Sequence, residues 1–188
     1  MCEWEMGVLV QDAHLRLINK PPGLLTLSGR HQLNKNSVHF RLIKDFPTAT
    51  LVHGLDFGTS GIMIVALDKA VNANIGKQFQ AHSVSKTYTA ILHGDVVAER
   101  GYIDKPIAKD RPNFPLQKIC HETGKGAITL YEVVERIKGE SGKPDSTRVI
   151  FKPASGRTHQ LRIHSRELGH PILGCDLYAT DEAFFMAE

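Results

Sequence analysis

The stretch His53-Gly-Leu-Asp-Phe-Gly-Thr-Ser-Gly-Ile-Met-Ile-Val-Ala66 places one carboxylate, Asp56, in a polar turn that leads directly into an apolar run. Two glycines in the turn allow backbone conformations closed to other residues, and a Thr-Ser pair adds hydroxyl groups that bond to nearby backbone. The run from Ile62 to Ala66 has the composition of a buried strand. The stretch therefore predicts a carboxylate fixed beside a buried strand, either as a reactive group or as a loop residue that accepts backbone N–H groups.

Length and composition set the class of protein. The chain has 188 residues, of which 41% are hydrophobic and 23% charged, so it is long enough to bury a core within one domain. Its net charge of +3 permits a polyanionic partner without demanding one. No basic region followed by a long apolar run opens the chain, and we expect a protein outside the membrane, in the cytoplasm.

Cysteine usage argues against a disulfide framework and against a structural zinc site. The three cysteines are odd in number, far apart and in no Cys-x-x-Cys pair, at positions Cys2, Cys120 and Cys175. We expect them to be reduced thiols.

The first half of the chain alternates short strands with helices. Apolar runs at 8–10 and 15–18 predict a hairpin, and the Pro-Pro-Gly sequence at 21–23 forces a turn beside Lys20. Helical spacing of apolar residues predicts one helix from about Ser37 to before Pro47. A second helix is expected from an Asp68 N-cap to about 81, with one buried face.

The second half begins with a predicted strand over 86–92. Strand alternation places Lys86 and Tyr88 on one face, where Tyr88 offers either an aromatic platform for a base or an ordinary core side chain. Residues 106–126 lack periodicity and carry several cations, among them Arg111 and Lys118, which suits either a nucleic-acid clamp or a solvated loop. Apolar residues at 129–135 and 149–151 then predict a second hairpin.

A basic helix is predicted near the end of the chain, over residues 158–168. Thr158 is the expected N-cap and Gly169 lies just past the end, with His159, Arg162 and Arg166 along one face. Together with Arg157 and His164, so many basic side chains are hard to explain as core and suit phosphate or carboxylate binding. A metal site is disfavoured because the two histidines lie five residues apart and point away from each other on a helix.

These stretches together resemble the RluA family of pseudouridine synthases in order and spacing. The signature comprises Asn19-Lys-Pro-x-Gly23, His53-x-Leu-Asp-x-x-Thr-Ser-Gly61, Lys86-x-Tyr88, Gly156-Arg-Thr-His-Gln-Leu-Arg-x-His164 and Gly169-His-Pro-Ile-x-Gly174. Each piece is weak alone, whereas the combination is highly specific and covers nearly the whole chain. The Pro112-Asn113 loop and the sequence from Gln117 to Lys125 look most like the RluA subgroup that modifies uridines in both ribosomal RNA and tRNA.

The resemblance implies an α+β fold with a mixed, largely antiparallel sheet and a central cleft, flanked by helices and loops, in one catalytic domain over 1–188. It implies an isomerase that converts uridine to pseudouridine in a large-subunit ribosomal RNA or tRNA stem-loop, as a monomer with no cofactor or metal. Asp56 matches the catalytic carboxylate, Arg162 its ion-pair partner and Tyr88 the aromatic residue beside the target base. Residues expected to bind RNA are His53, Gly54, Thr59, Lys86, Arg111, Lys118, Arg157 and His159.

The sequence departs from the family pattern in two places. Members usually carry Arg after the motif histidine, where it fills the space left by the flipped uridine, and here that residue is Gly54. Members also generally continue with an Arg-Leu-x-Leu-His-Ala strand, so we expect this chain to lack the last strands of the sheet, and no S4-type module precedes the catalytic region. These departures leave a second reading open, a non-catalytic RNA-binding or RNA-folding protein on the same scaffold.

Overall fold

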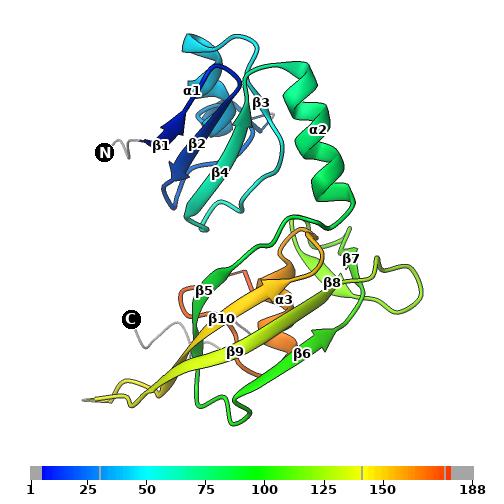
Figure 1. Ribbon diagram of the computed structural model, residues 1–188. Coiled ribbons are helices and arrows are strands. Elements are labelled where there is room, and N and C mark those ends of the chain that lie inside the picture. The colour runs from blue at the N-terminus through cyan, green and yellow to red at the C-terminus, as the bar shows by residue number, and fades with distance from the viewer. Residues whose placement is uncertain (1–5, 30, 141, 176, 179–188) are drawn as a thin grey trace. The chain divides into compact units, whose positions relative to one another are not determined.

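The computed structural model describes residues 6–29, 31–140, 142–175 and 177–178 and confirms the α+β class (Figure 1). The chain divides into two compact units, Met1–Val84 and Ser85–Glu188, and each is described by itself. Every pair of strands in the described residues is antiparallel. The central cleft and the single catalytic domain over 1–188 stay predictions, and the expectation for Cys2 lies outside the described residues.

A four-stranded sheet forms the framework of the first unit. Its strands are β1 (Gly7–Gln11), β2 (Leu15–Lys20), β3 (Thr50–Leu51) and β4 (Gly61–Ala66), in the spatial order β1-β2-β4-β3. The β1–β2 hairpin and the strand that follows the Asp56 turn are thereby confirmed. Because Lys20 lies opposite Gly61 in the β2–β4 register, the Pro-Pro-Gly turn meets the glycine-rich turn at one end of this sheet.

Two helices and a 3₁₀ turn (Gln32–Asn34) complete the first unit. Helix α1 (Val38–Asp45) is capped by the Ser37 hydroxyl, which accepts from Phe40 N, and it packs Val38 and Leu42 into the core with residues of β2 and β4. Helix α2 (Lys69–Gln80) is capped by Asp68, as predicted. The expected buried face of α2 is wrong, because Val71, Ile75 and Phe79 are only half-buried and no described residue of this helix is fully buried.

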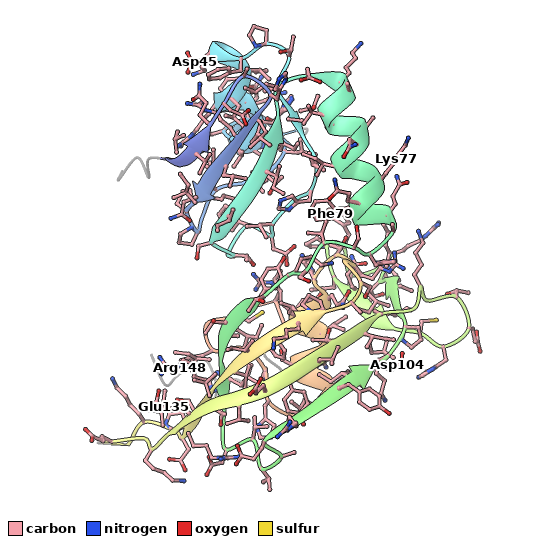
Figure 2. All side chains as sticks on the ribbon, in the orientation of Figure 1. Asp45, Lys77, Phe79, Asp104, Glu135 and Arg148 are labelled. Atoms are coloured by element: carbon pink, nitrogen blue, oxygen red, sulfur yellow. The ribbon has the colours of Figure 1, made fainter. Side chains whose placement is uncertain are left out.

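The second unit is built on another four-stranded sheet. Its strands are β5 (Tyr88–His93), β6 (Arg100–Asp104), β9 (Ile128–Ile137) and β10 (Ser146–Pro153), in the order β5-β10-β9-β6. The predicted β9–β10 hairpin is confirmed, and Arg148 pairs with Glu135 across it at 2.6 Å (Figure 2). Strand β5 begins at Tyr88, so Lys86 precedes the strand instead of opening it.

The segment expected to be irregular contains a small two-stranded sheet. Strands β7 (Ile107–Lys109) and β8 (Gln117–Ile119) pair antiparallel, which corrects the prediction for their residues. The loop between them is closed at its base, because Asp110 N donates to Leu116 O at 3.0 Å and Leu116 N donates to Asn113 O at 2.8 Å. The irregular part of the segment is therefore shorter than its sequence suggests.

Helix α3 (Gln160–Glu167) covers one face of the second sheet (Figure 1). Leu161 and Leu168 pack against the core cluster that contains Leu92 and Phe151. The predicted Thr158 cap is wrong, because the cap residue is His159, in a left-handed conformation with φ 54° and without a side-chain cap bond. Gly169 follows the helix with φ 86°, as its position predicts.

Candidate functional site

Hydrogen bonds from the end of β2 and the turn that follows it fix the turn that carries Asp56. Asp56 is half-buried, and its carbonyl oxygen accepts a hydrogen bond from Thr59 N at 3.0 Å, which closes the turn. The next carbonyl, of Phe57, accepts from Gly23 N at 2.9 Å and from Lys20 Nζ at 3.3 Å. The backbone at Asp56 and directly after it is thus held by hydrogen bonds.

Lys20 is a fully buried charged side chain, with 0% exposure. Its amine donates to Leu24 O at 2.8 Å and to Pro21 O at 2.9 Å, besides the bond to Phe57 O. Burial lowers its pKa from 10.5 to about 8, and the negative charge of Asp56 acts in the opposite direction. Lys20 therefore ties the Pro-Pro-Gly turn to the Asp56 turn and responds to the charge of that carboxylate.

This role of Lys20 was missed from the sequence, where it was expected only to lie near a turn. One signal was present: Ile18 and Lys20 share a face of β2, and Ile18 belongs to the core. A lysine on the buried face of a strand needs acceptors for its amine. The proline-rich turn provides two of them as backbone carbonyls.

The backbone beside Gly54 is held by one hydroxyl group. Thr26 Oγ1 donates to Leu55 O at 2.6 Å and accepts from Leu55 N at 3.1 Å. Gly54 itself is exposed, and a Cβ built on it would lie 3.2 Å from Thr26 Cγ2. A side chain at this position is therefore compatible with the backbone, provided that the Thr26 methyl group moves by a few tenths of an ångström.

Two contacts hold the His53 ring in the first unit, one with β4 and one with α2. Its Nε2 accepts a hydrogen bond from Ile64 N in β4 at 3.1 Å, which places the ring proton on Nδ1. The ring also stacks on Phe79, at the end of α2, with ring centroids 4.9 Å apart. The geometry supports a role for His53 in holding the Asp56 turn at β4, in addition to the RNA contact expected from the sequence.

In the second unit, Tyr88 opens β5 and Lys86 lies two residues before it. Lys86 Nζ donates to Ser155 O at 3.0 Å, and burial lowers the pKa of this amine. Tyr88 is half-buried and packs against the core cluster of this unit. Lys86 thereby meets the segment that leads into the basic helix.

The predicted basic residues gather around the first turn of α3. Arg157 Nε donates to Gly126 O at 3.1 Å, and the ring of His159 bonds through Nδ1 to Tyr178 Oη at 2.7 Å. Arg162 is half-buried, and its Nη1 donates to Cys175 Sγ at 3.0 Å. Lys86 lies beside this group, 3.7 Å from the position of a Cβ built on Gly156.

Two residues of the same signature are structural. Gln160 donates through Nε2 to Thr129 Oγ1 at 3.0 Å, and the Thr129 hydroxyl in turn donates to His164 Nδ1 at 2.8 Å. His164 Nε2 donates to Lys105 O at 3.0 Å. His164 is fully buried, and burial lowers its pKa, so the view of this histidine as too polar for the core is wrong.

The remaining predicted RNA-binding residues lie on the β7–β8 sheet and the loop that joins its strands. Arg111 is exposed in the loop, and Lys118 is exposed on β8, where its Nζ lies 4.0 Å from Asp110 Oδ1. Exposed ion pairs of this length contribute little to stability, so both cations are available to a partner.

The described residues offer neither a metal-binding cluster nor a helix that could span a membrane. No group of three His, Cys, Asp or Glu side chains in this part of the chain is arranged to hold a metal ion. Within the same residues, no helix has both the length and the apolar composition needed to cross a membrane.

The predicted site residues thus fall into two sets. One unit brings together His53, Gly54, Asp56 and Thr59 in a single turn. The other brings Lys86, Arg157, His159 and Arg162 around the start of α3, and holds Tyr88 on β5 and Arg111 and Lys118 near β8.

Comparison with known proteins gives one consistent result. Residues 14–167 match the family model described as RNA pseudouridylate synthase. The chain is 48% identical over 182 residues to the dual-specificity RNA pseudouridine synthase RluA of Yersinia pestis, covering 97% of this chain and 86% of that protein. It is 46% identical over 180 residues to the protein of the same name from Escherichia coli K12, covering 96% and 80% of the two chains.

A solved structure agrees with these sequence relatives. Human RNA pseudouridylate synthase domain containing 1 matches with a TM-score of 0.77 and 29% identity, over 96% of this chain and 71% of that one. The resemblance inferred from the signature stretches is confirmed. The chain belongs to the RNA pseudouridylate synthase family and, within it, to the RluA synthases.

Proposed function

We propose that this RNA pseudouridine synthase uses Asp56 as its catalytic carboxylate, with Arg162 as the ion-pair partner of that carboxylate and Tyr88 beside the target base. The observation that carries the proposal is the fixation of the Asp56 turn, in which Lys20 and Gly23 both bond to the carbonyl of Phe57. A turn held in this way keeps the carboxylate in one position. Preorganisation of this kind is what a reactive group requires.

The chemistry of the reaction fits a carboxylate paired with a guanidinium. Uridine is isomerised by breaking the N-glycosidic bond, rotating the base and rejoining it through carbon, so the enzyme must supply a nucleophile or base that stays ionised in a dry site. In the proposed site the guanidinium of Arg162 is the charged partner of Asp56, and bound RNA excludes water from both groups.

We infer that RNA is held by cationic side chains and by residues of the Asp56 turn. Arg111 and Lys118 supply exposed charge for phosphates, and Lys86, Arg157 and His159 surround the start of α3. His53, Gly54 and Thr59 line the turn beside Asp56. Contacts to phosphates fix the position of an RNA and contribute most of its affinity.

The substrates that we propose are those named for the relatives. The proteins from Yersinia pestis and Escherichia coli are called dual-specificity synthases, and the loop at Pro112-Asn113 resembles their subgroup. We therefore infer activity on a ribosomal RNA and on a tRNA stem-loop. We also infer that the enzyme acts as a monomer in the cytoplasm, where both RNAs are found.

The test is the release of tritium from RNA labelled at uracil C5, with tRNA and ribosomal transcripts as substrates. The wild type should release tritium from at least one of them in the presence of EDTA. Asp56→Asn should abolish release while the Kd for RNA stays nearly unchanged, because affinity comes mainly from cations. Asp45→Asn, at the exposed end of α1 in the same unit, is the matched control and should behave as wild type (Figure 2).

The outcomes separate the enzyme from its alternative. An Asp56→Asn protein that loses RNA binding together with turnover would show that Asp56 is structural. The second candidate function, a non-catalytic RNA-binding or RNA-folding protein, is favoured by the missing side chain at Gly54. It predicts that Asp56→Asn leaves every measurable activity intact.

A further inference from the structure

A segment near the end of the described chain continues the edge of the second sheet. Pro171 O accepts from His93 N at 2.9 Å, and Leu173 N donates to Ile91 O at 2.8 Å. Leu92 and Ile172 form an antiparallel bridge within this contact. Because β5 is an edge strand of its sheet, this segment covers backbone groups that would otherwise be unpaired.

After this contact, two buried side chains, Cys175 and Tyr178, contact residues at the start of α3. Cys175 is 3% exposed, and its sulfur accepts a hydrogen bond from Arg162 Nη1 at 3.0 Å. Tyr178 is 2% exposed, and its hydroxyl group bonds to His159 Nδ1 at 2.7 Å and accepts from Gln117 N at 2.9 Å. Both side chains therefore contact residues of the signature that the resemblance links to catalysis and RNA binding.

Backbone hydrogen bonds hold Cys175 and Tyr178 in position relative to each other. Cys175 N donates to Ile172 O at 3.1 Å, and Tyr178 N donates to Cys175 O at 3.3 Å, so the chain turns tightly at Cys175. Tyr178 and Cys175 also belong to the same buried cluster as Ile163, which lies on the inner side of α3. The sulfur is consequently fixed with respect to the helix from which Arg162 projects.

We propose that Cys175 is a positioning residue for Arg162, a role that rests on the function proposed above for this arginine. A guanidinium is planar and presents its five donors in a fixed fork, so a bond at one Nη sets the direction of the others. The sulfur of Cys175 orients the fork through Nη1. Arginine side chains lose considerable rotamer freedom when they are ordered, and a partner already in place reduces the cost of ordering during the reaction.

The test compares the variants Cys175→Ala and Cys175→Ser. The matched control is Cys120→Ala, because Cys120 is also a free cysteine but contacts Thr123 instead of Arg162. Single-turnover tritium release should fall about threefold to tenfold in Cys175→Ala, the range for one ordinary hydrogen bond. The Kd for RNA should stay within about twofold, and Cys175→Ser, which keeps an acceptor, should recover most of the rate. Cys120→Ala should match wild type.

A double-mutant cycle distinguishes positioning from a general structural effect. In an Arg162→Lys background, Cys175→Ala should cause little further loss of rate, because the fork that it orients is already gone. Additive losses in the two backgrounds, or equal rates for Cys175→Ala and Cys120→Ala, would overturn the proposal. A loss of rate that is matched by a lower melting temperature and is not rescued by Cys175→Ser would also overturn it.

A readout that does not depend on activity keeps the two proposals separate. In ¹⁵N NMR spectra of the arginine side chains, the Nε–H signal of Arg162 should be sharp in the wild type and in Cys120→Ala, and broadened in Cys175→Ala. An unchanged signal in Cys175→Ala refutes the positioning role, even in a fully active enzyme. A wild type that releases no tritium refutes the proposed function alone, and the NMR comparison still decides the role of Cys175.

Discussion

Replacing Lys20 with Met removes the amine that bonds to three carbonyl oxygens at the base of the Asp56 turn. The pKa of this amine is lowered from 10.5 to about 8, chiefly by burial. Between about pH 8 and about pH 10.5 the unfolded chain therefore binds a proton that the folded chain has released. The free energy of unfolding of the wild type should rise with pH in this window, because the unfolded state holds more protons.

The size of this rise follows from the two pKa values. At about 1.4 kcal/mol for each tenfold change in equilibrium constant, Lys20 alone should add about 3 kcal/mol of stability across the window. Other groups titrate in the same range, so the informative quantity is the difference between wild type and Lys20→Met. That difference should shift by about 3 kcal/mol in favour of the wild type as the pH is raised.

The assay is urea denaturation followed by circular dichroism at several pH values across the window. Lys77→Met is the matched control, because Lys77 belongs to the same unit and is exposed on α2 (Figure 2). Its difference from wild type should be nearly independent of pH. A Lys20→Met difference as flat as that of Lys77→Met would refute the account of a buried, charged amine bonded to three carbonyl groups.

Three further changes have expected outcomes. Arg162→Lys should lower single-turnover tritium release at least tenfold, because an ammonium cannot replace a planar fork, and Arg148→Lys on the sheet surface should not. Gly54→Arg should raise the rate on a structured stem-loop more than on an unstructured RNA of the same sequence. Adding Thr26→Ser, which removes the methyl group 3.2 Å from the new Cβ, should enhance this gain in rate. Equal effects on both RNAs would show that the position does not act through base flipping. Acidification below about pH 6.5 should destabilise the wild type more than His164→Gln, as measured by urea denaturation. The pKa of the buried His164 ring is lowered, so only the unfolded chain gains a proton at this histidine in that range. Parallel plots of unfolding free energy against pH for the two proteins would contradict this.

The regular elements of the fold were predictable because their local signals agree with their surroundings. Residue type and spacing predict the start of α1 near Ser37, the Asp68 cap, the β1–β2 hairpin and the strand after the Asp56 turn. The start of α3 did not follow. The side chain of Gln160 accepts from Arg157 N at 3.0 Å, and this contact satisfies the backbone upstream of the helix where the sequence favoured a cap at Thr158.

The residues of the site divide in the same way. Asp56 was recognisable because glycines and hydroxyl residues surround it in a fixed order. The burial of Lys20 depends on a carbonyl group 37 residues away along the chain, and the burial of His164 depends on Thr129 and on a carbonyl 59 residues away. Contacts of such long range leave no periodic trace in the sequence. Alternation along β2 places Lys20 on the core face without identifying this distant acceptor, and the basic composition around His164 conceals its burial.

The hydrogen bonds of Gln160 bear on how the signature itself should be understood. Its Oε1 accepts from Ser155 Oγ and Arg157 N, and its Nε2 donates to Ile128 O and Thr129 Oγ1, so the side-chain amide has no bonding capacity left. The four-residue spacing to His164 is then set by the single threonine hydroxyl that both side chains must reach. Hydrogen bonding within this unit consequently accounts for two letters of the signature, whether or not a protein that carries them modifies RNA. A search for inactive members of this lineage should therefore weigh changes at Asp56 and Arg162 and disregard the persistence of Gln160 and His164.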